Sequence, residues 1–337
     1  MVNLSSYISK AFTKSFLTIF LPLFFIGSLV FIVKISTMTS YMQIDFYDMM
    51  KIFSFNIPSI LFYTLPVSFM SALAITFIRL SNENELIAFF SLTIKPQKLL
   101  NPIWLIAMLF SIILLLIGLA LMPLTAQQFS SFKAEKITES QLNITPSQLG
   151  QKFGDFFVFI TDKDEHTMKN ITIFKKEENG SNQLFIASDA TLNNINSVFY
   201  LTLNHGSGYT YDEKSFKEIT YDKMEMLKDI NSDEFIFKNI VEYWSELYKK
   251  GKNKIFFFIF LSLLPLLALY PIASSTIVNP RYKKTSAFFV VAPLTIFFYV
   301  ISSLLEKDGT FLILSITTLS IFIVGYILFR VRVLKYF

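Results

Sequence analysis

The side chains suited to catalysis or metal binding are few. The two histidines are His166 and His205, and Asp162, Asp164 and Glu165 directly precede the first of them. A zinc site needs roughly four nitrogen, sulfur or oxygen ligands around one ion, and the chain has no cysteine. We therefore expect no metal site, and we interpret the acidic run before His166 as a solvated turn between strands.

Nucleotide-binding and nucleophile motifs are missing. The sequence holds no Gly-x-x-x-x-Gly-Lys-Ser/Thr loop and no Gly-x-Ser-x-Gly elbow. The two glycines of 205–208 could approach a phosphate, but no helical pattern follows them, so turn glycines are the favoured interpretation. The sequence predicts neither an enzyme nor a cofactor, and any ATP hydrolysis is expected in a partner subunit.

The elements around these residues are mostly apolar. Hydrophobic residues make up 53% of the chain and charged residues 16%, against about 25% charged residues in soluble domains. Long uncharged apolar runs predict transmembrane helices, because backbone polar groups in lipid must bond within the segment. Six such runs flank one polar block: 16–33, 52–78, 99–122, 255–278, 286–305 and 311–329.

We therefore predict an α-helical membrane protein with six transmembrane helices, arranged three plus three, and an inserted all-β domain. The first run is followed by no small-residue cleavage site, so it is not expected to be a signal peptide. The predicted divisions are 1–123 for the first three helices, with a short helix near 80–92, then 124–252 for the β domain and an amphipathic helix, and 253–337 for the last three helices.

Lysines and arginines predict the orientation of the spans. Eleven of them flank the spans on the side of both termini, whereas the opposite short loops hold three: Lys34, Lys51 and Lys307. Short loops rich in these residues face the cytoplasm, so we expect both termini inside and the polar block outside. The polar block is acidic overall, so the basic charge lies at the inner membrane surface and indicates no nucleic-acid partner.

The polar block has the pattern of a β domain. Its segments are rich in β-branched and aromatic residues, at a spacing typical of a sandwich or jelly roll. Asn179-Gly180 is a hairpin signal, and 205–208 is interpreted as a second turn. The predicted strands are 153–161, 170–176, 183–188, 197–204 and 209–220.

An amphipathic helix is predicted over 233–250. Acidic residues at its start and lysines at its end suit the helix dipole. Two placements stay open: the outer membrane boundary, leading into the fourth span, or a packing position under the β domain. The apolar residues at helical spacing are Phe237, Ile240, Val241, Trp244, Leu247 and Tyr248.

The loop between the second and third spans combines acids with apolar residues. Glu83 and Glu85 are followed by Leu86 and Phe89 within 79–90. We favour a short cytoplasmic helix that docks a partner over a solvated loop, because a solvated loop has little use for so many exposed apolar side chains.

The interiors of the six spans carry no Asp, Glu, Lys, Arg or His. Ion-coupled carriers and intramembrane proteases need such groups at membrane depth, so both classes are disfavoured and an apolar cavity would suit a lipid. Lys34 lies at the outer end of the first span. It is either an anchor that reaches the interface or a contact to an anionic headgroup, and the sequence alone favours the anchor.

The order of these parts resembles the LptF/LptG (YjgP/YjgQ) permeases of the lipopolysaccharide exporter, over essentially the whole chain. The similarity is stronger to LptF than to LptG. The segments that carry it are Leu65-Pro66-Val67-Ser68, Arg79-Leu80-Ser81-Asn82-Glu83-Asn84-Glu85-Leu86, Leu201-Thr202-Leu203-Asn204-His205-Gly206, Pro271-Ile272 and Val278-Asn279-Pro280-Arg281.

The resemblance implies a half-transporter in a bacterial inner membrane. It would pair with an LptG-like permease as a heterodimer and be driven by an LptB-like ATPase dimer. The cavity would take lipopolysaccharide from the membrane, and the periplasmic jelly roll would pass it to LptC-like and LptA-like proteins toward the outer membrane.

The resemblance also assigns roles to residues. Glu85 matches the acid of the coupling helix that meets an arginine of the ATPase, with Glu83, Leu86 and Phe89 beside it. Lys34 matches a basic position near the lipid A phosphates, which makes the headgroup role the favoured one. Phe31 stands where LptF relatives often carry a second basic residue. Spans one and five would form lateral gates, with Ile26, Val30, Tyr299 and Ser302 as candidate substrate contacts.

Two other classes of protein stay possible. A lipoprotein-releasing or mechanotransmitting permease usually has four spans with the external domain after the first, unlike the six expected here. A membrane-anchored binding or signalling module would work without an ATPase, and it leaves the apolar residues of 86–90 unexplained.

Overall fold

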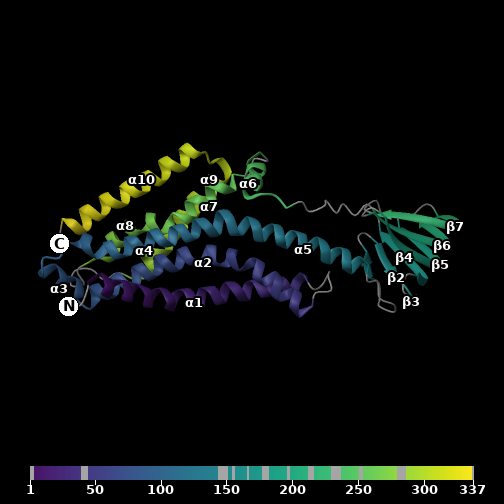
Figure 1. The fold of residues 1–337 in the computed structure, drawn as a ribbon, viewed down its shortest axis with the longest axis horizontal. Coiled ribbons are helices and arrows are strands. Elements are labelled where there is room, and N and C mark those ends of the chain that lie inside the picture. The colour runs from purple at the N-terminus through teal and green to yellow at the C-terminus, as the bar shows by residue number, and fades with distance from the viewer. Residues whose placement is uncertain are drawn as a thin grey trace. The chain divides into compact units, whose positions relative to one another are not determined.

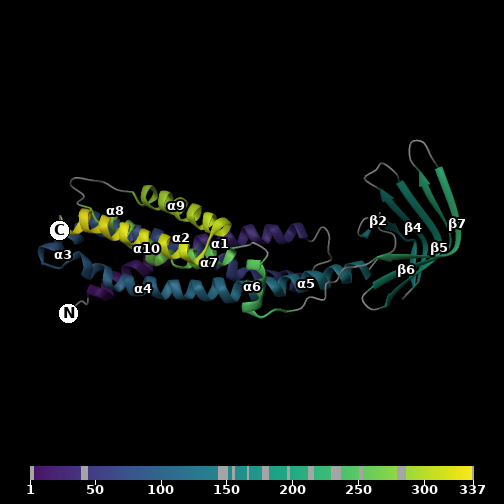
Figure 2. The same cartoon turned by 90° about the horizontal axis from the view of Figure 1, so that it is seen from above.

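The computed structural model describes residues 4–38, 45–142, 151–153, 156–164, 167–176, 182–195, 198–211, 216–228, 237–249, 253–278 and 286–335. The chain divides into two compact units. The helical unit contains Met1–Thr39, Asp45–Phe129 and Phe237–Phe337, and the β unit contains Ser40–Ile44 and Ser130–Ile236. Figures 1 and 2 show the helices and the strands of these units.

Long apolar helices build the helical unit. Among the described residues, five helices are long and apolar enough to cross a membrane, and the pair α7 and α8, bent by 48°, makes six if it counts as one broken span. The predicted helical membrane protein with an inserted β domain is confirmed. The helices are α1 (Leu4–Met38), α2 (Phe46–Asn82), α3 (Glu85–Ser91), α4 (Pro96–Leu116), the π-helix η1 (Ile117–Leu121), α5 (Met122–Leu142), α6 (Ile240–Lys249), α7 (Lys254–Ser262), α8 (Leu264–Thr276), α9 (Ala287–Asp308), α10 (Phe311–Phe329) and the π-helix η2 (Arg330–Leu334).

The bend between α7 and α8 has a local cause. Pro265 lies in the first turn of α8 and has no N–H to donate to the carbonyl of Leu261. The chain turns at Leu263, whose N–H donates to the carbonyls of Ile259 and Phe260. Pro22, by contrast, lies inside a continuous helix.

The helix α2 lies at the centre of the helical unit. Phe62, Phe69 and Phe77 are fully buried there, and small residues such as Ala268 let α8 approach closely. In the most apolar part of each span, 61% of the α2 residues are buried but only 11% of those of α1 and α10. The two outer helices therefore present apolar faces suited to lipid.

The described strands of the β unit form one antiparallel sheet. Its order is β1-β2-β4-β5-β6-β7, and β3 pairs with β4. The strands are β1 (Gln151–Phe153), β2 (Phe156–Phe159), β3 (Asp162–Asp164), β4 (Thr167–Lys176), β5 (Asn182–Ile195), β6 (Val198–Tyr211) and β7 (Phe216–Lys228).

The predicted turn at 205–208 is wrong. His205, Gly206, Ser207 and Gly208 lie inside β6, which pairs with β5 on one side and β7 on the other. The strands predicted at 197–204 and 209–220 are therefore replaced by the longer β6 and by β7. Asn179-Gly180 lies outside the described residues, and the strands that flank it pair antiparallel, as expected for a hairpin.

A bend replaces the predicted turn. Buried residues of one face are normally two apart along a strand, but Met168 and Ile171 on β4, like Ala187 and Ala190 on β5, are three apart. In the ladder Met168 pairs with Ala190 and Ile171 pairs with Ala187. Both strands therefore carry one extra residue at the same position, and the pairing beyond it stays in register.

The irregular position shared by β4 and β5 is also present in the next strand, β6. His205 has φ 50° and, on β4, Asn170 has φ 51°, a left-handed conformation that asparagine and histidine adopt more readily than most residues. The Oγ of Ser188 donates to the carbonyl of His205 at 3.2 Å, and Nδ2 of Asn204 donates to Oδ2 of Asp189 at 2.9 Å. Side chains thus bond across the bend.

The predicted amphipathic helix starts later than expected. The helix α6 begins at Ile240, and the described residues just before it, from Phe237 to Asn239, are not helical. The acids expected at its start lie outside the described residues. Instead, the Glu242 carboxylate accepts the N–H of Asn239 at 3.3 Å, as in half of a capping box.

Candidate functional site

The short helix α3 lies at the end of the helical unit that also holds the chain termini (Figure 1). The helix α2 ends at Asn82, and Asn84 takes a left-handed conformation with φ 61° that turns the chain into α3. Glu85 is the first residue of α3, and Leu86 is only 2% exposed. Burial of Leu86 therefore fixes this seven-residue helix to the core, since so short a helix is not stable by itself.

The first turn of α1 contacts α3 through one side chain. The hydroxyl of Tyr7 donates to the Glu85 carboxylate, at 2.8 Å from Oε1 and 2.7 Å from Oε2. The Tyr7 ring also meets the Phe89 ring edge-on, with centroids 6.4 Å apart. Glu85 and Phe89 are four residues apart on one helical face, so a single tyrosine covers both.

The expectation that 86–90 exposes its apolar side chains is wrong. Leu86 is buried in the core, and Phe89 is half-buried beside Tyr7. Glu83, by contrast, is exposed, and Leu92 just beyond the helix is the large apolar residue left exposed. A partner that docks on α3 would therefore meet Glu83, the edge of Glu85 and Leu92 rather than Leu86.

A half-open pocket lies at the opposite end of the helical unit. It has a volume of about 290 Å³. Two lysines line it, Lys34 from the end of α1 and Lys254 from the start of α7, and none of the described lining residues is acidic. The remaining lining residues are Phe55, Asn56, Ser59, Met122, Pro123, Thr125, Ala126, Phe129, Tyr243, Trp244, Leu247 and Phe258.

The chemistry of this pocket suits an anionic group attached to an apolar body. Asn56, Ser59 and Thr125 add hydrogen-bonding groups to the two ammonium groups. Burial raises the pKa of Tyr243, so its hydroxyl stays neutral and does not oppose an anion. Lys254 was not singled out by the sequence, although its place at the start of the fourth span was a usable signal.

The pocket wall is shaped by an irregular span. The π-helix η1 separates α4 from α5, and Pro123 is the second residue of α5. The indole N–H of Trp244 donates to the carbonyl of Leu119 at 3.0 Å, and its ring meets the Phe258 ring at 5.6 Å. These contacts fix α6 on the helical unit, and its predicted position at the outer membrane boundary stays a prediction.

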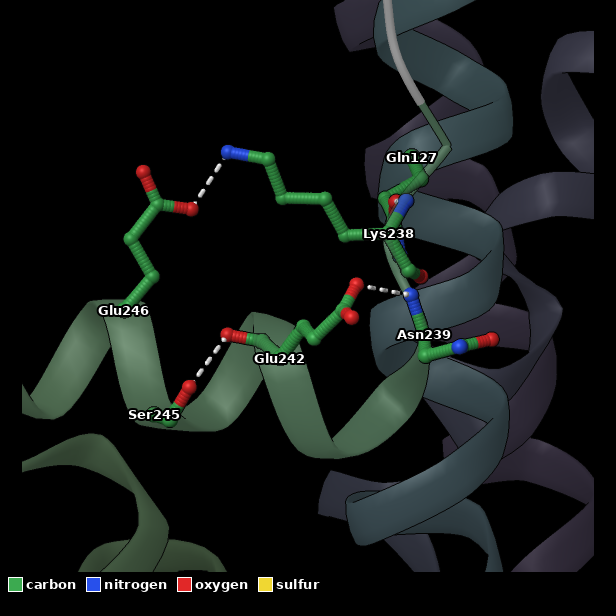
Figure 3. A network of polar contacts seen from close by, with 6 residues as sticks. All are labelled: Gln127, Lys238, Asn239, Glu242, Ser245 and Glu246. Carbon is green, nitrogen blue, oxygen red and sulfur yellow. Dashed lines mark hydrogen bonds and ion pairs between the residues drawn. The ribbon is translucent and has the colours of Figure 1, made fainter.

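The chain that leads into α6 is held by an amide clamp (Figure 3). Gln127 is buried, and its Nε2 donates to the carbonyl of Lys238 at 3.2 Å while its Oε1 accepts the N–H of Lys238 at 2.8 Å. The Lys238 ammonium also forms an ion pair with the carboxylate of Glu246, which lies within α6. The clamp explains why helix formation begins only after Lys238.

An apolar groove runs between α1, α2 and α9. It has a volume of about 520 Å³. The first and fifth spans thus meet at a groove. Its lining residues differ from the four gate residues that were predicted. Its lining residues are Ile19, Val67, Ser71, Ile75, Ala287, Phe288, Val291, Ala292, Thr295 and Ile296.

The four predicted gate residues take different positions. Ile26 and Val30 lie on the exposed face of α1, where Val30 is 66% exposed. Tyr299 is half-buried, and Ser302 is fully buried with its hydroxyl directed at the carbonyl of Phe257 at 3.5 Å. None of the four lines the pocket of Lys34 or the apolar groove.

The long apolar helices and the inserted β unit are those of a multi-pass membrane protein. The sequence model of the family described as lipopolysaccharide export system permease LptF/LptG matches residues 6–334, so the chain belongs to this family. It is therefore an inner-membrane permease of lipopolysaccharide transport. Among curated proteins no relative matches.

Proposed function

We propose that this chain is the LptF-like permease subunit of an ATP-driven lipopolysaccharide exporter. It extracts lipopolysaccharide from the inner membrane and passes it through the periplasmic β unit. The observation that carries the proposal is the pocket in which Lys34 and Lys254 lie among aromatic and apolar walls. Lipid A joins phosphate groups to acyl chains, which is the combination that such a pocket accommodates.

Lys34 and Lys254 are the headgroup contacts in this proposal. A lysine that binds a phosphate forms charge-assisted hydrogen bonds, which are stronger than neutral ones. Phe31 is buried against Phe53 and supplies no charge, so Lys254 takes the place of the second cation that relatives carry in the first span. The acyl chains lie along the apolar groove between α1 and α9.

The two ends of the helical unit face opposite sides of the membrane. The α3 end and both termini are cytoplasmic, and the end with Lys34 is periplasmic, as the distribution of basic residues supports. An LptG-like permease completes the cavity, an LptB-like ATPase dimer binds at α3, and LptC-like and LptA-like proteins continue the path from the β unit. In this proposal the acyl chains reach the apolar side of the sheet, where Ile171, Ile173 and Leu203 are buried.

ATP hydrolysis is needed because the apolar environment alone gives little direction. Burying a CH₂ group away from water is worth about 0.8 kcal/mol, but acyl chains in a bilayer are already buried. Moving them into an equally apolar groove therefore gains little. A push on Glu85 by the ATPase supplies the missing free energy and makes the transfer directional.

A crosslinking experiment tests the headgroup contacts. A photoreactive amino acid replaces Asn56, which lines the pocket, in the complete complex with lipopolysaccharide. We expect a crosslink that weakens in Lys34→Gln and in Lys254→Gln but not in Lys307→Gln, because Lys307 is exposed and does not line the pocket. Equal crosslinking in all variants would contradict the proposed site.

A second experiment tests the partners. The chain is purified in mild detergent, and the proteins and lipids that come with it are identified by mass spectrometry. We expect an ATPase, a second six-span permease and lipopolysaccharide. Glu85→Ala is expected to uncouple ATP hydrolysis from export, and normal export by this variant would exclude the coupling role.

A further inference from the structure

The two ends of α1 contact the two sites of the helical unit. Near its start, Tyr7 bonds to Glu85 of α3, and near its end, Lys34 lines the headgroup pocket. The helix is continuous from Leu4 to Met38. At 1.5 Å per residue, Tyr7 and Lys34 lie about 40 Å apart along it, which is the thickness of a bilayer with its headgroup regions.

We propose that Tyr7 is a positioning residue that couples α3 to the headgroup pocket through α1. The inference rests on the proposed function, in which the ATPase acts on Glu85 and lipid binds near Lys34. Displacement of α3 by the ATPase pulls or releases α1 through the Tyr7–Glu85 bond. The opposite end of α1 then moves Lys34 relative to Lys254, and the lipid headgroup is released.

The Glu85 carboxylate can serve two partners at once. A carboxylate has about four lone-pair positions, and the Tyr7 hydroxyl uses one donor between its two oxygens. Glu85 is only partly buried, so one edge stays accessible to a cation from the ATPase. The same group then joins the ATPase to α1, and force applied at the carboxylate reaches Tyr7 directly.

The rest of α3 is attached elsewhere. Leu86 packs into the core, and Ser81, just before the turn into α3, donates to the carbonyl of Val278 at the end of the α8 span. Leu86 therefore holds α3 to the core, and the Ser81 bond ties the end of α2, which precedes α3, to the segment after α8. The Tyr7 contact is different because it ties α3 to α1, a helix that packs on the core through Ile8 and Phe12 and exposes its opposite face.

The Lys34 end of α1 is also connected to the pocket by packing. Ile35 is buried, Phe31 meets Phe53 of α2, and a Cβ on Gly27 would lie 3.0 Å from Ile60. The last three turns of α1 are therefore packed closely against α2, whereas Lys254 comes from α7. A shift of α1 therefore changes the distance between Lys34 and Lys254. This distance determines how well the two lysines hold one phosphate.

Tyr7→Phe in the assembled exporter tests the inference. This change removes the hydroxyl and keeps the ring that meets Phe89. The readout is the loss of the Asn56 crosslink to lipopolysaccharide on addition of ATP, divided by the ATP hydrolysed. We expect this ratio to fall about fivefold or more, the usual lower range of coupling between two sites, with normal assembly, normal ATPase rate and a normal crosslink before ATP.

Two further variants separate the explanations. Tyr47→Phe is the matched control, because Tyr47 is exposed on α2, and it should leave the ratio unchanged. Thr13→Val removes an exposed hydrogen bond that stays within α1 and does not reach α3, and it should also leave the ratio unchanged.

The outcomes distinguish this inference from the proposed function. A Tyr7→Phe variant with a normal ratio overturns the inference while the headgroup site stands. A fall in assembly and ATPase rate with an unchanged ratio also overturns it, because Tyr7 would then only hold α3 in place. Absence of any Asn56 crosslink in the unaltered protein would contradict the proposed function instead.

Discussion

The indole N–H of Trp244 donates to the main-chain carbonyl of Leu119 at 3.0 Å. In an α-helix this carbonyl would accept the N–H of residue 123, but that residue is Pro123 and has none. A carbonyl without a donor is costly where water is excluded. Trp244 supplies a donor to this carbonyl from a helix 125 residues away in the sequence, and it fixes α6 beside the headgroup pocket.

Trp244→Phe is expected to destabilise the helical unit. The ring contact with Phe258 is kept, but the Leu119 carbonyl loses its donor, at a cost of about 1–3 kcal/mol. The thermal midpoint in detergent should fall by at least about 2 °C. Trp104→Phe is the matched control. Trp104 is 44% exposed on α4, so this variant has the same substitution at a lipid-facing position. Equal midpoints for the two variants would exclude the role given to the indole N–H.

Gln127→Glu tests the amide clamp on Lys238. A glutamate can still accept the N–H of Lys238, but it cannot donate to the carbonyl. We expect hydrogen exchange at the Lys238 amide to speed up by about tenfold, as for a loss of about 1.4 kcal/mol. The adjacent Gln128 is exposed, so Gln128→Glu adds the same charge without touching the clamp and should leave this amide unchanged.

Much of the fold was predictable because its determinants are local. Runs of apolar residues specify the spans, and Glu85 was found because acids precede apolar residues over a few positions. Its partner Tyr7 is 78 residues away, and no local pattern connects the two. The same holds for Trp244 and Leu119, because only the folded chain shows which carbonyl lacks a donor.

The turn predicted at His205 failed for a related reason. Glycine, histidine and serine in a row are typical of turns, but in the sheet the neighbouring strands carry an extra residue at the same level. The left-handed conformation that would end an isolated strand instead continues as a bend, because Asn170 adopts it two strands away. The register between neighbouring strands decides whether the segment forms a turn or a bend. This register cannot be predicted from the sequence of one segment alone.

Lys34 and Lys254 are expected to discriminate between phosphorylated lipids. Loss of one charge-assisted contact costs about 1.5–3 kcal/mol, so each single Lys→Gln variant should bind bisphosphorylated lipid A roughly tenfold or more weakly. If both lysines hold one phosphate, the double variant will lose less than the sum of the two effects. Binding is measured by native mass spectrometry, with Lys307→Gln as the control.

The outcome for a lipid with one phosphate completes this test. A lipid A that lacks the phosphate held by the two lysines should bind the unaltered protein and the double variant equally, because the lysines then have no partner. A double variant that weakens both lipids to the same extent would indicate a general loss of membrane-surface charge, and it would contradict a specific pocket.

Gly206→Ala is expected to disrupt the bend of the sheet. A Cβ at this position would lie 2.3 Å from the carbonyl oxygen of Ile186 and 2.6 Å from the hydroxyl of Tyr221. The carbonyl belongs to the neighbouring strand and already accepts the Tyr221 hydroxyl at 3.2 Å, so the backbone of β5 must move. At Gly208 the nearest atom is 3.0 Å away in the Phe185 ring, which can rotate.

Gly206→Ala should therefore cost about 1–3 kcal/mol, seen as faster hydrogen exchange in β5 and β6 of the full chain, whereas Gly208→Ala should cost less. Equal exchange in both variants would mean that the backbone around Ile186 yields freely and that the bend is not a fixed feature.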